Sequence, residues 1–129
     1  MDEQAKEQAL KLVPYGMYVI GSGEGDDVNG MTANWVCQVS FDPCLVAVAI
    51  KHAAHTRSLI DQYGHFTVNI VPDGALDLLR LFVKPQRRVQ DKFGDDVGFR
   101  ESGLGAPILD AAVAWVECKV RAAMARVAL

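Results

Sequence analysis

Small residues and polar side chains gather between residues 26 and 40, where the sequence reads DDVNGMTANWVCQVS. Thr32, Asn34 and Ser40 offer hydroxyl and amide groups, while Gly30 and Ala33 leave the backbone open to close approach. A strand end of this kind can hold an anion on its free backbone N–H groups. The same residues also suit a tight corner of a β-barrel, where small side chains relieve crowding. Spacing alone leaves both interpretations open.

Cations that could complete an anion site occur later in the chain, at Arg57, Lys84, Arg88 and Lys92. A phosphate dianion requires at least one such group, although any one of the four is more often a solvated surface residue than a ligand. The cysteines Cys37, Cys44 and Cys118, taken with the histidines His52, His55 and His65, match no zinc-binding spacing. The sequence therefore predicts no metal site. We expect His65 to be structural and Cys37 to serve packing.

The composition is that of one globular domain spanning residues 1–129. Half of the residues are apolar, which is enough for a single core. The formal net charge of −3 argues against a nucleic-acid partner, and no apolar run approaches the roughly 18 residues that span a bilayer. An odd number of cysteines without a secretory signal predicts reduced thiols in a cytoplasmic protein.

The first half of the chain predicts a helix and three strands. Residues 2–13 have helical periodicity that Pro14 ends, and residues 15–22 are rich in β-forming side chains before a glycine-rich turn. Residues 28–39 would return as the second strand of a hairpin. Residues 44–50 are apolar without alternation, which is typical of a strand buried on both faces.

The second half predicts a helix capped by Thr56 and ended by Gly64. A strand over 65–71 and a helix over 73–83 follow, and the remaining predicted elements are a short helical piece at 88–94 and a strand over 112–121. Five strands with few, short helices and hairpin links favour a mainly β fold, an antiparallel barrel.

Several short segments, in this order, resemble the flavin reductase-like family of FMN-binding split barrels, which includes NAD(P)H:flavin oxidoreductases and flavoredoxins. The matching positions are Gly30, Thr32 and Ala33, then Ser40 and Pro43, then Thr56, then Val68 and Asn69, then 91–94, and last the stretch 105–118. The resemblance covers about residues 13 to 120. It implies a split β-barrel that forms homodimers and holds FMN, or in some members FAD, in a cleft near the dimer interface.

The resemblance also implies which residues contact the flavin. The segment of Gly30, Met31, Thr32, Ala33, Asn34 and Trp35 would line the ring and its polar edge, and Ser40 would lie beside the ribityl chain. Ile50, Lys51, His52, His55 and Thr56 would form the next wall, with the helix start at Thr56 facing the phosphate and Lys92 among the candidate cations. Trp35 either stacks beside the flavin or belongs to the dimer core. The two histidines either touch the ligands or lie on the surface.

Members of the family continue after the strand that matches WVECKV with a Gly-Asp-His turn and two more strands, whereas here the sequence reads RAAMARVAL. The resemblance thus predicts a C-terminally shortened barrel with an open edge, which either a partner subunit or the tail would cover.

Three functions follow from these observations. The first is an NAD(P)H-dependent flavin reductase that supplies reduced flavin or electrons to a partner such as a monooxygenase or an iron protein. It requires no acid or base side chain, because the flavin carries the chemistry, so no catalytic residue is assigned. The second is a flavin-binding electron-transfer module without reductase activity. The third is a barrel that binds no ligand.

Overall fold

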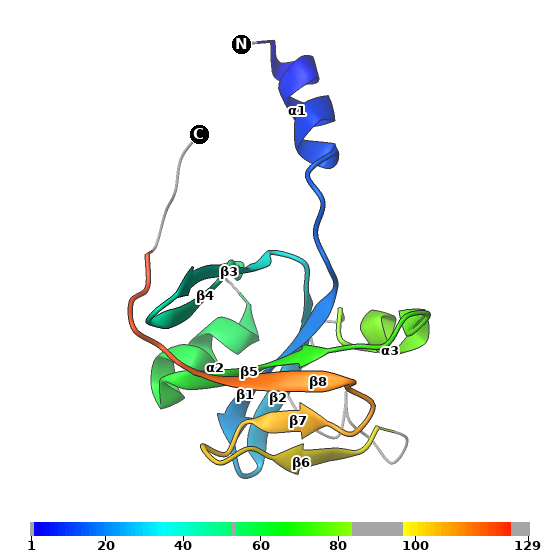
Figure 1. Ribbon diagram of the computed structural model, residues 1–129. Helices are drawn as coiled ribbons and strands as arrows, with labels where there is room; N and C mark the ends of the chain where they lie inside the picture. Colours follow the sequence, from blue (N-terminus) through cyan, green and yellow to red (C-terminus); the bar gives the residue numbers. More distant parts are fainter. Residues whose placement is uncertain (1, 53, 84–96, 125–129) are drawn as a thin grey trace.

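The computed structural model describes residues 2–52, 54–83 and 97–124 (Figure 1). Its helices are α1 (Glu3–Lys11), α2 (His55–Tyr63) and α3 (Leu76–Leu81). Its strands are β1 (Tyr18–Glu24), β2 (Asp27–Ala33), β3 (Val36–Phe41), β4 (Cys44–Val48), β5 (His65–Ile70), β6 (Phe99–Glu101), β7 (Pro107–Leu109) and β8 (Ala114–Lys119). All the strand pairs are antiparallel. The predicted mainly β, antiparallel fold with few short helices is confirmed.

A four-stranded sheet in the order β2-β1-β5-β8 forms the body of the molecule. Because neighbouring residues of a strand point to opposite faces, Val19 and Ile20 of β1 enter different parts of the core. Ile20 packs in one cluster with Ile60 of α2, and Val19 packs in another with Phe82 and Leu109. Helix α2 therefore covers one face of the sheet, while α3 and β7 cover the other.

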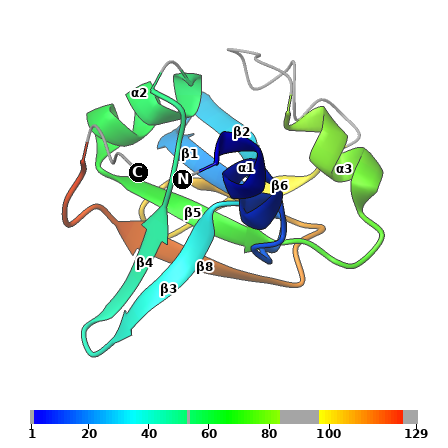
Figure 2. The same cartoon turned by 90° about the horizontal axis from the view of Figure 1, so that it is seen from above.

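Two smaller antiparallel pairs, β3 with β4 and β6 with β7, accompany the main sheet. The β3–β4 pair is a ribbon that projects from the body of the molecule (Figure 2). Helix α1 lies away from the sheet and is joined to β1 by an extended segment (Figure 1). None of its residues is buried, and it begins at Asp2, whose side chain accepts the Gln4 N–H at 3.0 Å. None of the described helices has the length and apolarity to span a bilayer.

The β3–β4 ribbon corrects two predictions. Residues 44–48 are exposed or half-buried, so the expectation that this strand is buried on both faces is wrong. The reason is that β4 pairs only with β3 among the described strands and forms part of no larger sheet. Cys37, expected to pack, is also exposed on this ribbon.

Other predicted elements differ in length or number. The predicted return strand 28–39 divides at Asn34 and Trp35 into β2 and β3. Strands β6 and β7 were not predicted, since three residues are too few to show an alternating pattern. The predicted strand 112–121 is present as β8, and the helical piece at 88–94 lies outside the described residues.

Gly23 in the β1–β2 hairpin gives a first stability prediction. Its φ is +92°, and a Cβ at this position would lie 1.8 Å from the Asp27 carbonyl oxygen. Gly25 in the same hairpin has a φ of +58° but open space around it. We expect Gly23→Ala to lower the free energy of unfolding by about 3 kcal/mol and Gly25→Ala by only about 1 kcal/mol. Urea unfolding of both variants checks this, and equal losses would contradict the steric argument.

Glu117 of β8 gives a second prediction, on pH. Its Oε2 accepts the Leu104 N–H at 2.8 Å, and the Ser102 hydroxyl together with this amide holds the pKa of Glu117 below its ordinary value of 4.5. A carboxylate with a lowered pKa stabilises the fold above its unfolded-state pKa, and this contribution is lost as the pH falls through the folded-state pKa. We therefore expect Glu117→Gln to lower Tm at about pH 7 and to change it little at about pH 3. Calorimetry at both pH values is the measurement, and an equal change at both would contradict it.

Candidate functional site

The small-residue segment lies at the end of β2, an edge strand of the main sheet. Gly30 and Ala33 are buried and Met31 is half-buried, and both Met31 and Ala33 belong to the core cluster around Ile20. The Ala33 side chain therefore faces the core, and its contribution to a ligand would come from its backbone. Trp35, in the connection to β3, is 62 % exposed. The segment thus runs from the core to the surface within six residues, from Gly30 to Trp35.

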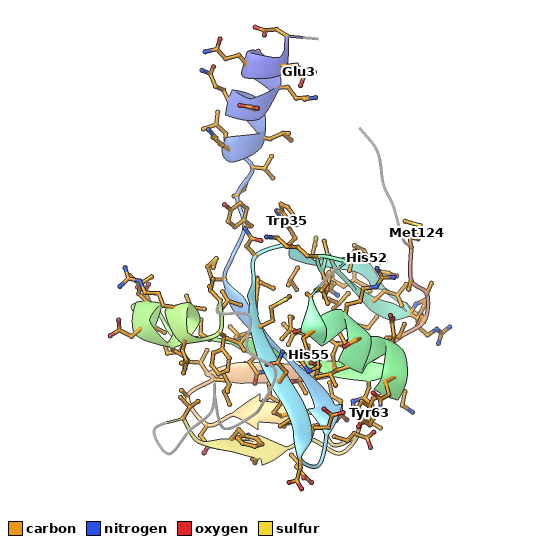
Figure 3. All side chains as sticks on the ribbon, turned by 180° about the vertical axis from the view of Figure 1, so that it is seen from behind. Glu3, Trp35, His52, His55, Tyr63 and Met124 are labelled. Atoms are coloured by element: carbon orange, nitrogen blue, oxygen red, sulfur yellow. The ribbon has the colours of Figure 1, made fainter. Side chains whose placement is uncertain are left out.

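The segment that follows β4 lies beside this connection. The Ala49 N–H donates to the Trp35 carbonyl at 3.0 Å, which places the start of the predicted second wall next to the end of the first. Ile50 packs against the core cluster, whereas Lys51 and His52 are exposed. Figure 3 shows Trp35 and His52 at the end of the molecule from which the α1 segment rises. The structure thus brings together two of the segments predicted from the sequence.

Helix α2 begins next to these residues without a side-chain cap. Its N-cap is Ala54, in extended conformation, which makes no side-chain capping hydrogen bond. The first N–H groups of a helix have no partner within the helix, and the helix dipole adds partial positive charge there. The Arg57 N–H donates to the Ala54 carbonyl at 3.1 Å, and within the described part of the chain the preceding amides, at His55 and Thr56, have no backbone acceptor. The expectation that Thr56 is the N-cap is wrong.

A basic side chain accompanies this helix start. The Arg57 guanidinium contacts His52 Nδ1 and lies 3.6 Å from the Asp61 carboxylate one turn further along α2. His55 lies within the first turn, and its Nδ1 is 3.3 Å from the Ser58 Oγ. Uncapped amides beside a guanidinium make the start of α2 the part of the described chain best suited to hold a phosphate.

Asn29 joins β2 to α2, and sequence reasoning missed it. Its Nδ2 donates to the Thr56 Oγ at 3.4 Å, and the two residues are only 2 % and 1 % exposed. The Asn29 Oδ1 is buried and has no hydrogen-bond partner among the described residues. The sequence signal that could have indicated Asn29 is its polar amide side chain within a segment that is otherwise rich in apolar and small residues. Since an unpaired buried carbonyl is costly, Asn29 offers an acceptor to a ligand.

Thr32 turns toward α3. Its hydroxyl donates to the Leu79 carbonyl at 2.6 Å, and its N–H donates to the Phe82 carbonyl at 3.2 Å. Both donors of this predicted flavin contact are therefore engaged within the protein.

One other predicted residue, Ser40, is not brought to this site. Ser40 lies four residues beyond the start of β3, roughly 13 Å along the strand, beyond an irregularity between Gln38 and Ser40. Lys92 lies outside the described residues, as do Lys84 and Arg88.

His65 is buried with its Nε2 2.7 Å from the Glu24 carboxylate, in keeping with the structural role expected for it. In the described part of the chain, no group of three or more His, Cys, Asp or Glu side chains is placed to hold a metal ion.

The chain is similar to flavin reductases in sequence and in structure. The model of the flavin reductase like domain matches residues 10–127. A diflavin flavoprotein of Synechocystis is 32 % identical over 119 residues, which are 92 % of this chain and 21 % of the relative. The chain therefore spans about a fifth of the length of the diflavin relatives that it matches.

Solved structures give the same result. The NADH:FAD oxidoreductase of Streptomyces globisporus superposes with a TM-score of 0.80 at 28 % identity, covering 95 % of this chain and 74 % of that one. A flavin reductase in its native state superposes with a TM-score of 0.77 at 31 % identity, covering 95 % and 76 %. The fold is the antiparallel split β-barrel of these enzymes, as the sequence predicted. Because the family model matches residues 10–127, most of its length, the chain belongs to the flavin reductase-like family.

Proposed function

We propose that the protein binds FMN between the end of β2 and the start of α2 and acts as an NAD(P)H-dependent flavin reductase. The observation that carries the proposal is the uncapped start of α2, which Thr56 and Asn29 join to the strand that matches the family's flavin-binding segment. The family match and the similarity to an NADH:FAD oxidoreductase support it.

The described residues fit the parts of FMN. The first-turn amides of α2, with Arg57 beside them, would hold the phosphate dianion. The buried Asn29 Oδ1 is an acceptor suited to a ribityl hydroxyl. The exposed Trp35, with the backbone of Asn34, would border the ring at the open end of the site. Lys51, His52 and His55 lie around the same entrance and would meet the phosphate or the nicotinamide.

Bound FMN supplies the hydride-accepting ring, and the chain's own residues hold and orient it. Fixed donors near the polar edge of the ring would stabilise the negative charge that arrives with the hydride. The backbone N–H groups between Ala33 and Trp35 are the candidates for this role. Proton transfer by a side chain is not required, so we assign no catalytic acid or base.

The similarity to a segment of a diflavin flavoprotein favours a second candidate, a flavin-bound electron-transfer module that receives electrons from elsewhere. In either case we propose a homodimer, an electron acceptor such as a monooxygenase or an iron protein, and a cytoplasmic location. The free thiols of Cys37, Cys44 and Cys118 support that location.

A single titration separates the candidates. Apo-protein is titrated with FMN, FAD and riboflavin under anaerobic conditions, and NADH or NADPH is then added while the flavin absorbance is followed. Saturable FMN binding with bleaching much faster than that of free flavin supports the reductase. Saturable binding with no acceleration supports the electron-transfer module. If no flavin binds, both candidates are rejected.

A further inference from the structure

Thr32 makes two hydrogen bonds to the end of α3, although the two elements are far apart in the sequence. The hydroxyl reaches the Leu79 carbonyl at 2.6 Å, and the N–H reaches the Phe82 carbonyl at 3.2 Å. Leu79 belongs to the last turn of α3, and Phe82 is its C-cap residue. One strand residue therefore binds two carbonyl groups at the C-terminal end of this helix.

Helix α3 depends on such support. It has six residues and no side-chain hydrogen bond at its N-cap, Ala75, and helices this short are unstable without tertiary contacts. The last carbonyls of a helix lack partners within it. Thr32 satisfies two of the carbonyl groups at this end, and the fully buried Phe82 anchors the same end in the core with Val19 and Leu109.

These contacts also restrain β2 itself. Thr32 stands in the middle of the segment from Gly30 to Trp35, and β2 is an edge strand whose outer side has no strand partner in the described sheet. At that point the outward-facing Thr32 N–H donates to the end of α3 instead of to another strand. The position of α3 and the position of the flavin-binding segment are thus coupled through one residue.

We propose that Thr32 is a positioning residue, which caps α3 and thereby fixes the β2 segment that holds the flavin. This inference rests on the proposed function. It reassigns Thr32 from the ring-lining role that the family resemblance implies, because both of its donors are used by α3. The flavin then receives its donors from neighbouring backbone groups, and Thr32 acts on the ligand only through the placement of β2.

The test compares three variants of the full chain in the ligand-free state. Thr32→Val removes the hydroxyl at nearly constant shape, and Thr32→Ser keeps it. Thr67→Val is the matched control, since the Thr67 hydroxyl also donates to a backbone carbonyl, that of Pro107 at 2.5 Å, on the β7 side of the sheet. Hydrogen exchange of the amides of α3 should become about tenfold faster in Thr32→Val. It should stay close to wild type in Thr32→Ser, and in Thr67→Val it should not be accelerated selectively.

Flavin binding supplies the second measurement. We expect Thr32→Val to bind FMN about tenfold more weakly, with faster dissociation, while the absorption spectrum and the reduction potential of the bound flavin stay as in wild type. Rescue of both the exchange rate and the affinity by Thr32→Ser supports the positioning role.

Two results would overturn the proposal. One is unchanged exchange of α3 in Thr32→Val. The other is a shifted flavin potential in that variant, which would make Thr32 a direct ligand. If wild-type protein binds no FMN, the proposed function fails together with the flavin half of this inference, whereas the exchange of α3 still decides whether Thr32 caps the helix.

Discussion

Replacing Ala54 with aspartate is expected to weaken FMN binding by about a hundredfold while making the ligand-free protein more stable. Ala54 is the N-cap of α2 and has the extended conformation that capping side chains require. An aspartate there would accept hydrogen bonds from amides of the first turn and stabilise the helix by about 1 kcal/mol. The same carboxylate would occupy the proposed phosphate site and repel the dianion.

Two comparisons make this prediction specific. Ala54→Asn caps the helix without a charge, so it should stabilise the protein similarly but weaken FMN binding less. Riboflavin lacks the phosphate, so its affinity should be nearly unchanged by Ala54→Asp. Isothermal titration with both ligands and thermal unfolding of the ligand-free proteins are the measurements. An equal loss of affinity for FMN and riboflavin would show that the phosphate does not lie at α2.

The two ends of α2 show what local sequence can predict and what it cannot. Gly64 was predicted to end the helix, and it does so with a φ of +77°, because a left-handed terminal residue is a local requirement that favours glycine. Thr56 was predicted as the N-cap by the same local logic. Its side chain is instead bound by Asn29, 27 residues earlier in the chain. A local pattern contains no information about that partner.

In the candidate site, too, some features were predictable from the sequence and others depend on tertiary contacts. The resemblance placed the segments around Gly30 and Thr56 in one site, and the structure brings them together through β2, α2 and the Ala49–Trp35 hydrogen bond. Ser40 was expected there as well but lies further along the ribbon, past an irregularity of register. Register depends on pairing between strands, which residue types along one strand do not determine. The contact of Thr32 with Leu79 is likewise a tertiary contact, which no spacing could indicate.

The β3–β4 ribbon leads to the second large prediction. Its strand β4 was expected to be buried on both faces but is exposed or half-buried within one chain, and on β3 Phe41 is 90 % and Val39 59 % exposed. The hydrophobicity of a strand indicates that something covers it without indicating what does, and exposed apolar patches of this kind are typical of interfaces. Strand β8 exposes Trp115 and Val116 as well. In the proposed homodimer, these surfaces would be covered by a second copy.

We expect Phe41→Asp to raise the dimer dissociation constant by about thirtyfold or more, because an exposed aromatic side chain at an interface is a typical hot spot. Sedimentation equilibrium measures the change. Leu76→Asp is the control: Leu76 is also an exposed apolar residue, 54 % exposed, but it lies on α3 and should leave dimerisation unchanged. Dissociation by both variants to the same extent, or by neither, would contradict an interface at the ribbon.

The same variant connects assembly with flavin binding. Strand β3 follows Trp35 directly, and the Ala49–Trp35 hydrogen bond joins the base of the ribbon to the segment that leads into α2. Loss of the second copy should therefore loosen the flavin site, and Phe41→Asp should bind FMN weakly at low protein concentration. If only the dimer binds FMN tightly, the apparent affinity for FMN rises with protein concentration, by mass action. Recovery of FMN affinity at high concentration of the variant would show that the dimer completes the site, whereas weak binding at every concentration would place the effect within the single chain.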